Sequence, residues 1–129
     1  MNVTVKTKLT LDLELIDKIE NTAKRSALIK TAEFVLGEVV NSGKVPKLSG
    51  ELERSGFINE VSNSIVQIIF DTPYARRWYF NTEGATFRKE YNANAQDHWM
   101  DDFIHGERQS EIKEKFAEFY REELKGILK

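Results

Sequence analysis

The sequence predicts an α+β domain in which a small, largely antiparallel sheet packs with a long N-terminal helix and with C-terminal helices. Apolar residues at helical spacing over residues 15–40 predict the first helix, and those over residues 107–128 predict the last. Between them, two strand-like runs around a short polar turn over residues 57–70 predict a β-hairpin. The 129 residues, 40% of them apolar and 31% charged, suit a single domain that spans residues 1–129.

The N-terminal segment over residues 2–11 alternates between apolar and polar residues and predicts a strand with one buried face. The apolar positions of this alternation are Val3, Val5, Leu9 and Leu11. Asp12 is then placed to cap the long helix, and Gly43 to end it in a left-handed conformation. Any break in this helix is expected at residues 24–26.

An irregular loop is predicted over residues 43–56, which contain three glycines and one proline, with a single helical turn over residues 49–54. The second run of the hairpin is apolar on both faces, so we expect it at the centre of the sheet. The rest of the chain is expected to form a short helix that begins at Pro73, a strand over residues 86–91, and helices over residues 95–103 and 107–128.

Aromatic residues of the two C-terminal helices are expected to anchor the core, because they lie on apolar stripes that must face it. These core anchors are Trp99, Phe103, Phe116 and Phe119. Trp99 in particular is expected to be buried together with Leu36 of the long helix and Ile68 of the hairpin.

No residue pattern singles out a catalytic, cofactor-binding or metal-binding site. Cysteine is absent, which excludes disulfides and thiol catalysis, and neither a Walker A loop nor a dinucleotide fingerprint occurs. His98 and His105 are seven residues apart, which on a helix is about 10 Å and too far for one metal ion. Asp101 lies between them and could pair with either. We expect no enzyme activity, cofactor or metal, although 21 acidic residues always leave a hydrolase built on paired carboxylates open.

The charge balance disfavours binding to nucleic acid. Nineteen basic residues stand against 21 acidic ones, for a net charge of −2, whereas proteins that bind through phosphates normally carry a basic excess. The run Arg76-Arg77-Trp78-Tyr79 could clamp phosphates and stack bases, but two arginines make a small patch. We therefore expect no sequence-specific nucleic-acid binding. No run of 18 apolar residues occurs, so no contact with a membrane is expected either.

Contacts with other protein subunits are predicted at the loop over residues 43–56 and at an arginine pair. Apolar side chains on an irregular segment need burial in the core or against a partner. Arg76 and Arg77 are adjacent, so on a helix they cannot both face inward, and an exposed arginine suits ion pairs across an interface. The candidate interface residues are Val45, Pro46, Leu48, Leu52, Arg76 and Arg77.

Three short elements follow one another in a fixed order. The first is Pro46-x-x-Ser49-Gly50-Glu51-Leu52-x-x-Ser55. After the predicted hairpin, the second is Thr72-Pro73-Tyr74-Ala75-Arg76-Arg77-Trp78-Tyr79. The third is Asn92-Ala93-Asn94-Ala95-x-x-x-Trp99-x-x-x-Phe103. Together, over roughly residues 12–105, they resemble the minor capsid (head–tail connector, neck) proteins of tailed bacteriophages and prophages, and the final helix matches these proteins in position only.

The resemblance implies a small α+β fold shared with phage neck and tail-completion proteins, and no enzymatic activity. It implies copies that assemble as a homo-oligomeric ring between the DNA-filled head and the tail, with other neck, portal-adaptor or tail-end proteins as partners. The location it implies is the virion, after synthesis in the cytoplasm of the bacterial host. Residues 80–84 depart from the family, because many relatives carry more aromatic residues there. Two alternatives are a tail-terminator or tail-completion protein of the same broad fold, and a non-viral intracellular protein-binding module.

Overall fold

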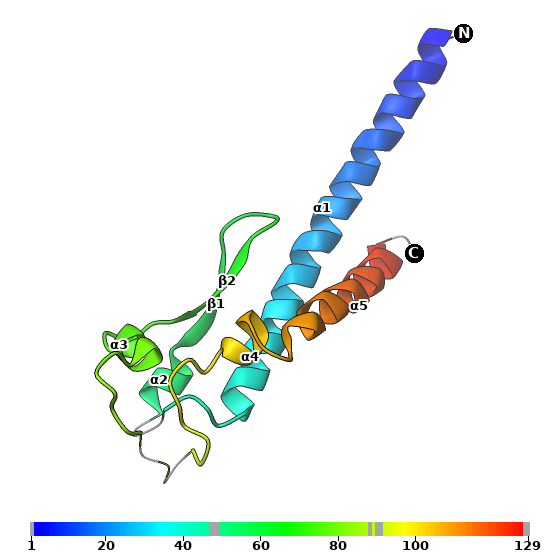
Figure 1. Cartoon of the computed structure of the whole chain (residues 1–129). Coiled ribbons are helices and arrows are strands. Elements are labelled where there is room, and N and C mark those ends of the chain that lie inside the picture. The colour runs from blue at the N-terminus through cyan, green and yellow to red at the C-terminus, as the bar shows by residue number, and fades with distance from the viewer. Residues whose placement is uncertain (1, 47–49, 88, 90–91, 128–129) are drawn as a thin grey trace.

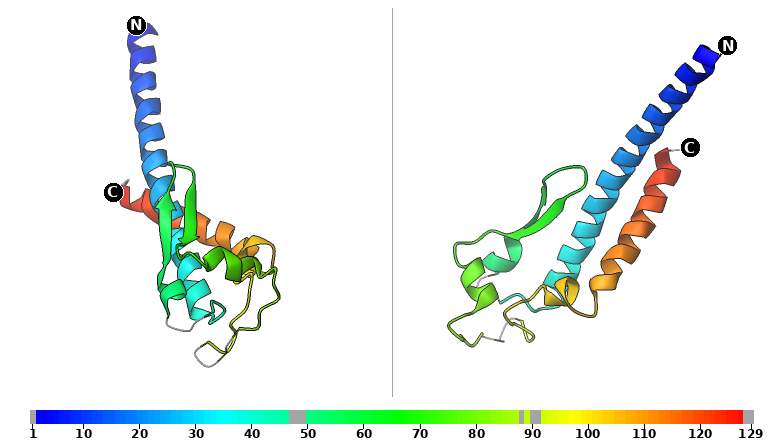
Figure 2. Two further views of the ribbon diagram at one scale, coloured as in Figure 1. Left: turned by 90° about the vertical axis from the view of Figure 1, so that its left-hand side faces the viewer. Right: turned by 45° about the horizontal axis from the view of Figure 1, so that its top comes forward.

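The computed structural model describes residues 2–46, 50–87, 89 and 92–127, with side chains described from Asp17 onward. The elements are α1 (Asn2–Asn41), α2 (Glu51–Arg54), β1 (Gly56–Glu60), β2 (Val66–Phe70), α3 (Ala75–Phe80), α4 (Asp101–Ile104) and α5 (Gln109–Ile127) (Figure 1). α5 lies along α1, and the hairpin lies against α1 on another side (Figure 2). The short helices gather near the C-terminal end of α1. The predicted α+β class is confirmed.

α1 is a single helix that includes the segment predicted to be a strand. The prediction of a strand over residues 2–11 is therefore wrong. A strand needs a neighbouring strand to satisfy its backbone groups, and within the described part of the chain β1 and β2 pair only with each other. A helix satisfies those groups internally, whatever the alternation of its side chains. Residues 24–26 are helical too, so the expected position of a break lies inside a continuous helix.

The end of α1 follows the prediction. Gly43 has a φ of +70°, in the left-handed region that glycine adopts without strain. The backbone N–H of Ser42 donates to the carbonyl of Glu38, and that of Gly43 to Val40. The helix therefore stops at the Asn41-Ser42-Gly43 signal in the sequence.

The hairpin is confirmed, but its second strand is not central. β1 and β2 are antiparallel, with Phe57 opposite Ile69 and Ile58 opposite Ile68, and they form a two-stranded sheet. One face packs inward, where Ile68 contacts the core cluster. The other face carries Phe57, which is 43% exposed. The apolar character of β2 on both faces thus reflects a partly exposed outer face, not a sheet covered on both sides.

The segment before α5 is less regular than predicted. Residues 86, 87 and 89 are in no strand, and residues 88, 90 and 91 of the expected strand lie outside the described residues. The helix expected over residues 95–103 is replaced by turns and by the short α4. His98 has a φ of +47°, and its N–H donates to the carbonyl of Tyr79 at 2.9 Å instead of to a preceding turn. This long-range bond prevents a continuous helix.

The core lies where α1, the loop after it, α3 and α4 meet. Its buried members are Val35, Val39, Val45, Leu52, Ala75, Trp99 and Phe103. Trp99 is 3% exposed and Phe103 4%. Phe116 and Phe119 are only partly buried, and Leu36 likewise. α5 packs against α1 and the short α4, and it has no fully buried residue among those described.

Charged and aromatic side chains fasten α5 to α1 in an antiparallel arrangement. Arg108 Nη2 lies 3.3 Å from Glu38 Oε2, near the start of α5. Lys30 and Glu123 form an ion pair near its end. Of the helices in the described residues, none combines the length and the apolar character needed to cross a bilayer.

Candidate protein-interaction surface

α3 presents both predicted arginines to solvent. Arg77 Nη2 donates to Glu83 Oε2 at 2.7 Å, and these two side chains are 60% and 63% exposed. The guanidinium of Arg77 also lies over Trp78, 5.2 Å from the ring centroid. An ion pair this exposed contributes little stability, because water and salt screen it. Arg77 can therefore exchange Glu83 for a carboxylate on another protein at small cost.

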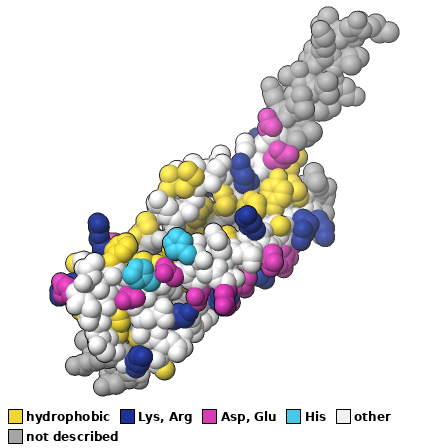
Figure 3. Space-filling model, in the orientation of Figure 1, with side chains coloured by type: hydrophobic (Ala, Val, Ile, Leu, Met, Phe, Trp, Pro, Cys, Tyr) yellow, Lys and Arg dark blue, Asp and Glu magenta, His cyan; other side chains and the backbone are white. Residues whose placement is uncertain are grey.

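An exposed aromatic ring accompanies the arginines. Phe80 is 52% exposed, and the guanidinium of Arg76 lies 5.9 Å from its ring centroid. The His98 ring contacts Phe80 edge-on, with centroids 5.9 Å apart. We call Arg76, Arg77, Phe80 and His98 the α3 surface. Arginine and aromatic side chains are the types enriched at the centres of protein interfaces. In Figure 3, apolar, basic and histidine side chains lie close together at the end of the molecule that α3 occupies.

The turn after α3 fixes the position of Glu83. Asn81 has a φ of +44° and ends the helix, with its N–H donating to the Arg77 carbonyl at 2.9 Å. Its side-chain oxygen accepts from the Ala85 N–H at 2.8 Å, and its amide nitrogen donates to Asp97 Oδ2 at 3.2 Å. This clamp holds the turn closed, so Glu83 is kept beside Arg77.

The two acidic residues near His98 have different partners. His98 Nδ1 lies 3.1 Å from Asp97 Oδ1, and this hydrogen bond lowers the pKa of Asp97, with Asn81 acting in the same direction. Tyr79 donates its hydroxyl hydrogen to Asp101 Oδ1 at 3.3 Å. Burial, reinforced by the Asp101 charge, raises the pKa of Tyr79 to about 12. Asp101 is thus bonded to Tyr79, whereas the sequence suggested a pairing with histidine.

Nothing in this neighbourhood forms a metal centre. No three His, Asp or Glu side chains come close enough to hold a metal ion in the part of the chain that the structure describes. What the α3 surface offers is contact chemistry: two cations, one exposed ring and a histidine.

The loop after α1 requires a correction. Val45 is fully buried and Leu52 is 4% exposed, and both belong to the core. They are core residues and not interface residues, because the chain itself covers them. Pro46 is half-buried, and Leu48 lies outside the described residues. Of the predicted interface residues that the structure describes, Arg76 and Arg77 are the exposed ones.

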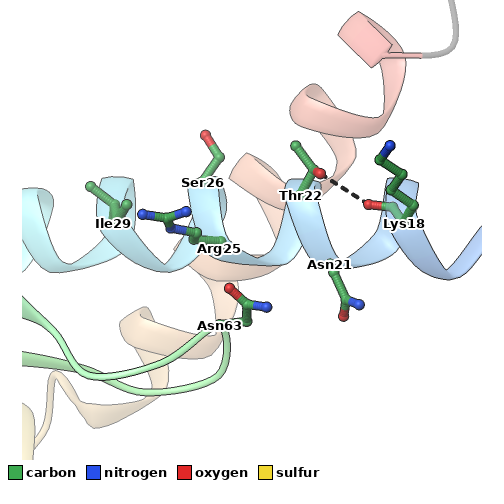
Figure 4. Close-up of a pocket in the computed structure, with 7 residues that line it drawn as sticks. All are labelled: Lys18, Asn21, Thr22, Arg25, Ser26, Ile29 and Asn63. Carbon is green, nitrogen blue, oxygen red and sulfur yellow. Dashed lines mark hydrogen bonds between the residues drawn. The ribbon is translucent and has the colours of Figure 1, made fainter.

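A groove of about 380 Å³ lies between α1 and the turn of the hairpin. Its lining residues are Lys18, Asn21, Thr22, Arg25, Ser26, Ile29 and Asn63 (Figure 4). Arg25 donates from Nε and Nη2 to Glu60 Oε2, at 3.0 and 2.6 Å. Of the two basic residues that line the groove, Lys18 and Arg25, Arg25 is therefore already paired. The two charged residues that line the groove, Lys18 and Arg25, are both exposed, which gives the groove no evident ligand.

Sequence reasoning missed Phe80, Asn81 and Glu83 as parts of the surface. The run Asn81-Thr82-Glu83-Gly84 after a helix is typical of a turn, and this signal could have placed Glu83 near the preceding helical turn. No pattern in the sequence indicated that Phe80 would be exposed. Comparison of the chain with protein-family models, curated proteins and solved structures gave no match.

Proposed function

We propose that the chain is a structural virion protein of a tailed phage or prophage, a minor capsid or head–tail connector protein that joins the DNA-filled head to the tail. It acts by contact and not by catalysis. One observation carries the proposal beyond the resemblance in sequence. The three elements that carry the resemblance, far apart along the chain, pack together.

The three elements share one core. Leu52 of the first, Ala75 of the second, and Trp99 and Phe103 of the third belong to the same buried cluster. The Tyr74 hydroxyl donates to Glu51 Oε2 at 3.2 Å, which links the second element to the first. Short motifs that recur by chance have no reason to meet in space, whereas the residues of a common fold do.

Polar contacts link the third element to the rest. The Asn92 amide donates to the Val45 carbonyl at 2.8 Å, and the Gln96 N–H donates to the Lys44 carbonyl at 2.9 Å. The ring of Tyr79 meets Trp99 edge-on, with centroids 4.8 Å apart. Asn92, Tyr79 and Trp99 of the motifs thus make contacts that hold the three elements together, which explains why they occur together.

In the proposed role, copies of the chain form a ring and contact neighbouring neck, portal-adaptor or tail-end proteins in the virion. A ring requires different surfaces of two copies to meet. The α3 surface is our candidate for one of these, since Arg77 can exchange its exposed internal partner. A net charge of −2 leaves only weak repulsion between copies.

The test is the fate of particles when the gene is disrupted in a phage or induced prophage that carries it. We expect filled heads and separate tails in electron micrographs, and the chain in the mass spectrum of purified wild-type virions. Tails of uncontrolled length would instead indicate a tail terminator. Normal infectious particles that lack the chain would contradict the proposal and favour an intracellular binding module.

A further inference from the structure

The face of the hairpin that points away from α1 carries apolar side chains in the open. Phe57, Val61 and Ile65 are 43%, 52% and 53% exposed, and they make up half of the six large apolar residues that stand exposed in the described part of the chain. The left view of Figure 2 looks onto this face, with α1 behind the hairpin. An antiparallel sheet with one side in water normally carries polar residues on that side. The hairpin departs from this rule.

The register of the strands shows which residues share this face. Phe57 lies opposite Ile69, and Asn59 opposite Gln67. The Val61 N–H donates to the Ile65 carbonyl at 3.0 Å, which continues the same ladder toward the turn. Side chains two residues apart on a strand point to the same side of the sheet. We call these six residues the hairpin face: Phe57, Asn59, Val61, Ile65, Gln67 and Ile69.

The opposite side of the hairpin is the covered one. Ile68 and Phe70 pack against the core cluster there. Glu60 of the same side reaches α1, where Arg25 Nη2 donates to Glu60 Oε2 at 2.6 Å. In the described residues, α1 is the helix that makes extensive contacts with both strands. The described helices therefore leave the hairpin face largely uncovered.

The hairpin face carries no charge. Glu60 is the only charged residue over residues 57–70, and it belongs to the covered side. In the middle of the face, the Asn59 amide nitrogen donates to Gln67 Oε1 at 3.1 Å. One apolar pair lies beyond this amide pair toward the turn, and another toward the base of the hairpin. A charged partner would lose its water here and gain no opposite charge.

The order of these pairs is the same when it is read from the turn or from the base. Consider a second copy placed face to face, about a two-fold axis that runs between the faces and crosses the strands at the amide pair. The partner's Val61 then lies over Phe57, and the partner's Ile65 over Ile69. Each amide lies over the same amide of the other copy. Every apolar side chain of the hairpin face thus meets an apolar side chain, as a self-complementary contact requires.

The amide pair favours a second copy over an unrelated apolar surface. Apolar cover would leave the remaining hydrogen-bonding atoms of Asn59 and Gln67 without partners, at a cost of about 1–3 kcal/mol for each unpaired group. An amide both donates and accepts, so two identical amides bond to each other. No charge on the face repels its own copy. The hairpin face is therefore complementary to itself.

We propose that two copies of the chain associate through the hairpin face, face to face, as a two-fold pair in which the strands of the two copies run antiparallel. Five-residue strands are about 17 Å long, so the contact is smaller than the roughly 800 Å² per partner of a stable interface. The pair is accordingly weak, with a dissociation constant on the order of 100 μM to 1 mM. It is a property of the free chain that does not use the α3 surface, and its failure would leave the proposed role in the virion unaffected.

Sedimentation equilibrium of the full chain tests the association. At concentrations on the order of 1 mM, the mass of the wild type is expected to rise from 14.9 kDa toward twice that value. Ile65→Lys places a charge in the hairpin face and is expected to keep the mass of one chain. The matched control is Ile127→Lys, because Ile127 is also exposed but lies at the end of α5, and this variant is expected to associate like the wild type.

Three outcomes of this measurement would overturn the proposal. They are a wild type that stays monomeric, a dimer that survives Ile65→Lys, and a dimer that Ile127→Lys also abolishes.

Opposite charges test the register. Val61 lies over the partner's Phe57 in the proposed pair, so Val61→Lys and Phe57→Glu are each expected to be monomeric alone. In an equimolar mixture the introduced lysine lies over the introduced glutamate, and the mass is expected to rise again toward that of two chains. A pair with its two turns at the same end would instead place Val61 over the partner's Ile65. The mixture would then stay monomeric, which would contradict the antiparallel arrangement.

Discussion

The indole of Trp99 meets the phenol ring of Tyr79 edge-on, with ring centroids 4.8 Å apart and planes at 87°. A second edge-on contact joins the same indole to Phe70, with centroids 5.7 Å apart. Trp99 therefore ties α3 and the end of β2 to the segment that precedes α4. Because this side chain is only 3% exposed, its packing contributes to the stability of the whole core.

Truncation of Trp99 is the first prediction. Trp99→Ala is expected to lower the free energy of unfolding by about 3–5 kcal/mol, because it leaves a large cavity. Trp99→Phe is expected to lose much less, because it keeps an aromatic ring and because the buried Nε1 has no hydrogen-bond partner among the described residues. Urea unfolding of both variants measures the difference. A loss below about 1 kcal/mol for alanine would show that the indole is not a core anchor.

Tyr79 predicts how stability changes in alkaline solution. The pKa of its phenol is raised from 10.0 to about 12 in the folded chain, chiefly by burial. Between these values the unfolded chain releases the proton while the folded chain retains it, so ionisation favours unfolding. The contribution is fully present below the ordinary pKa and is lost as pH rises toward the folded value. Tyr79→Phe cannot ionise there.

The measurement for Tyr79 is the urea midpoint of the wild type and of Tyr79→Phe at about pH 8 and at about pH 11. The wild type is expected to lose more stability between these two conditions than the variant does. Equal losses would mean that Tyr79 titrates like a phenol in water and is not sheltered by its surroundings.

Two glycines predict opposite effects of the same substitution. A Cβ at Gly106 would lie 2.8 Å from Asp102 Cα and 3.1 Å from its carbonyl oxygen, so the backbone between α4 and α5 must shift. Gly106→Ala is expected to cost about 1–3 kcal/mol. Gly37 lies within α1, and apart from its own helical turn no atom of the described residues comes within 4 Å of such a Cβ, so Gly37→Ala is expected to gain about 0.5–1 kcal/mol. Thermal or urea unfolding measures the change in the free energy of unfolding for both variants. An unchanged stability of Gly106→Ala would contradict the close packing at this glycine.

The arginines of α3 predict a defect in assembly without a defect in folding. Arg76→Glu combined with Arg77→Glu removes one exposed ion pair and is expected to change the free energy of unfolding by at most about 1 kcal/mol. In a phage that carries the gene, the same variant is expected to give filled heads and separate tails. The matched control is Glu83→Gln, which frees Arg77 from its internal partner and is expected to allow joining. Normal infectivity of the double variant would leave the arginines as plain solvated surface.

Local patterns predicted the elements whose signals are contained in one segment. The apolar stripe of α5, the polar turn of the hairpin and the stop at Gly43 each depend on neighbours in the sequence, and the structure has all three. The error at residues 2–11 has a physical origin. The apolar positions there fit an alternating strand, but Val5 and Leu9 also fit a helical stripe, and only the absence of a pairing strand among the described residues decides between them.

The remaining errors depend on contacts between distant segments. The bond from the His98 N–H to the Tyr79 carbonyl breaks the expected helix, and no pattern near His98 announces it. Arg76 and Arg77 of the α3 surface are adjacent on one helix, and this was enough to predict that at least one of them is exposed. Burial of Val45 could not be predicted, because an apolar residue in a loop gives the same signal whether its own chain or another covers it.

The order of α1 and α5 along the chain affects how the protein is made. Sixty-seven residues separate the end of α1 at Asn41 from the start of α5 at Gln109. At a translation rate of about 5–20 residues per second, the ribosome needs on the order of several seconds to supply the second helix after the first is complete. During that time Ala27 and Phe34, which α5 covers in the folded chain, have no cover of their own. The nascent chain is therefore most open to chaperones, and to neighbouring nascent chains on the same messenger, before its last 19-residue helix emerges.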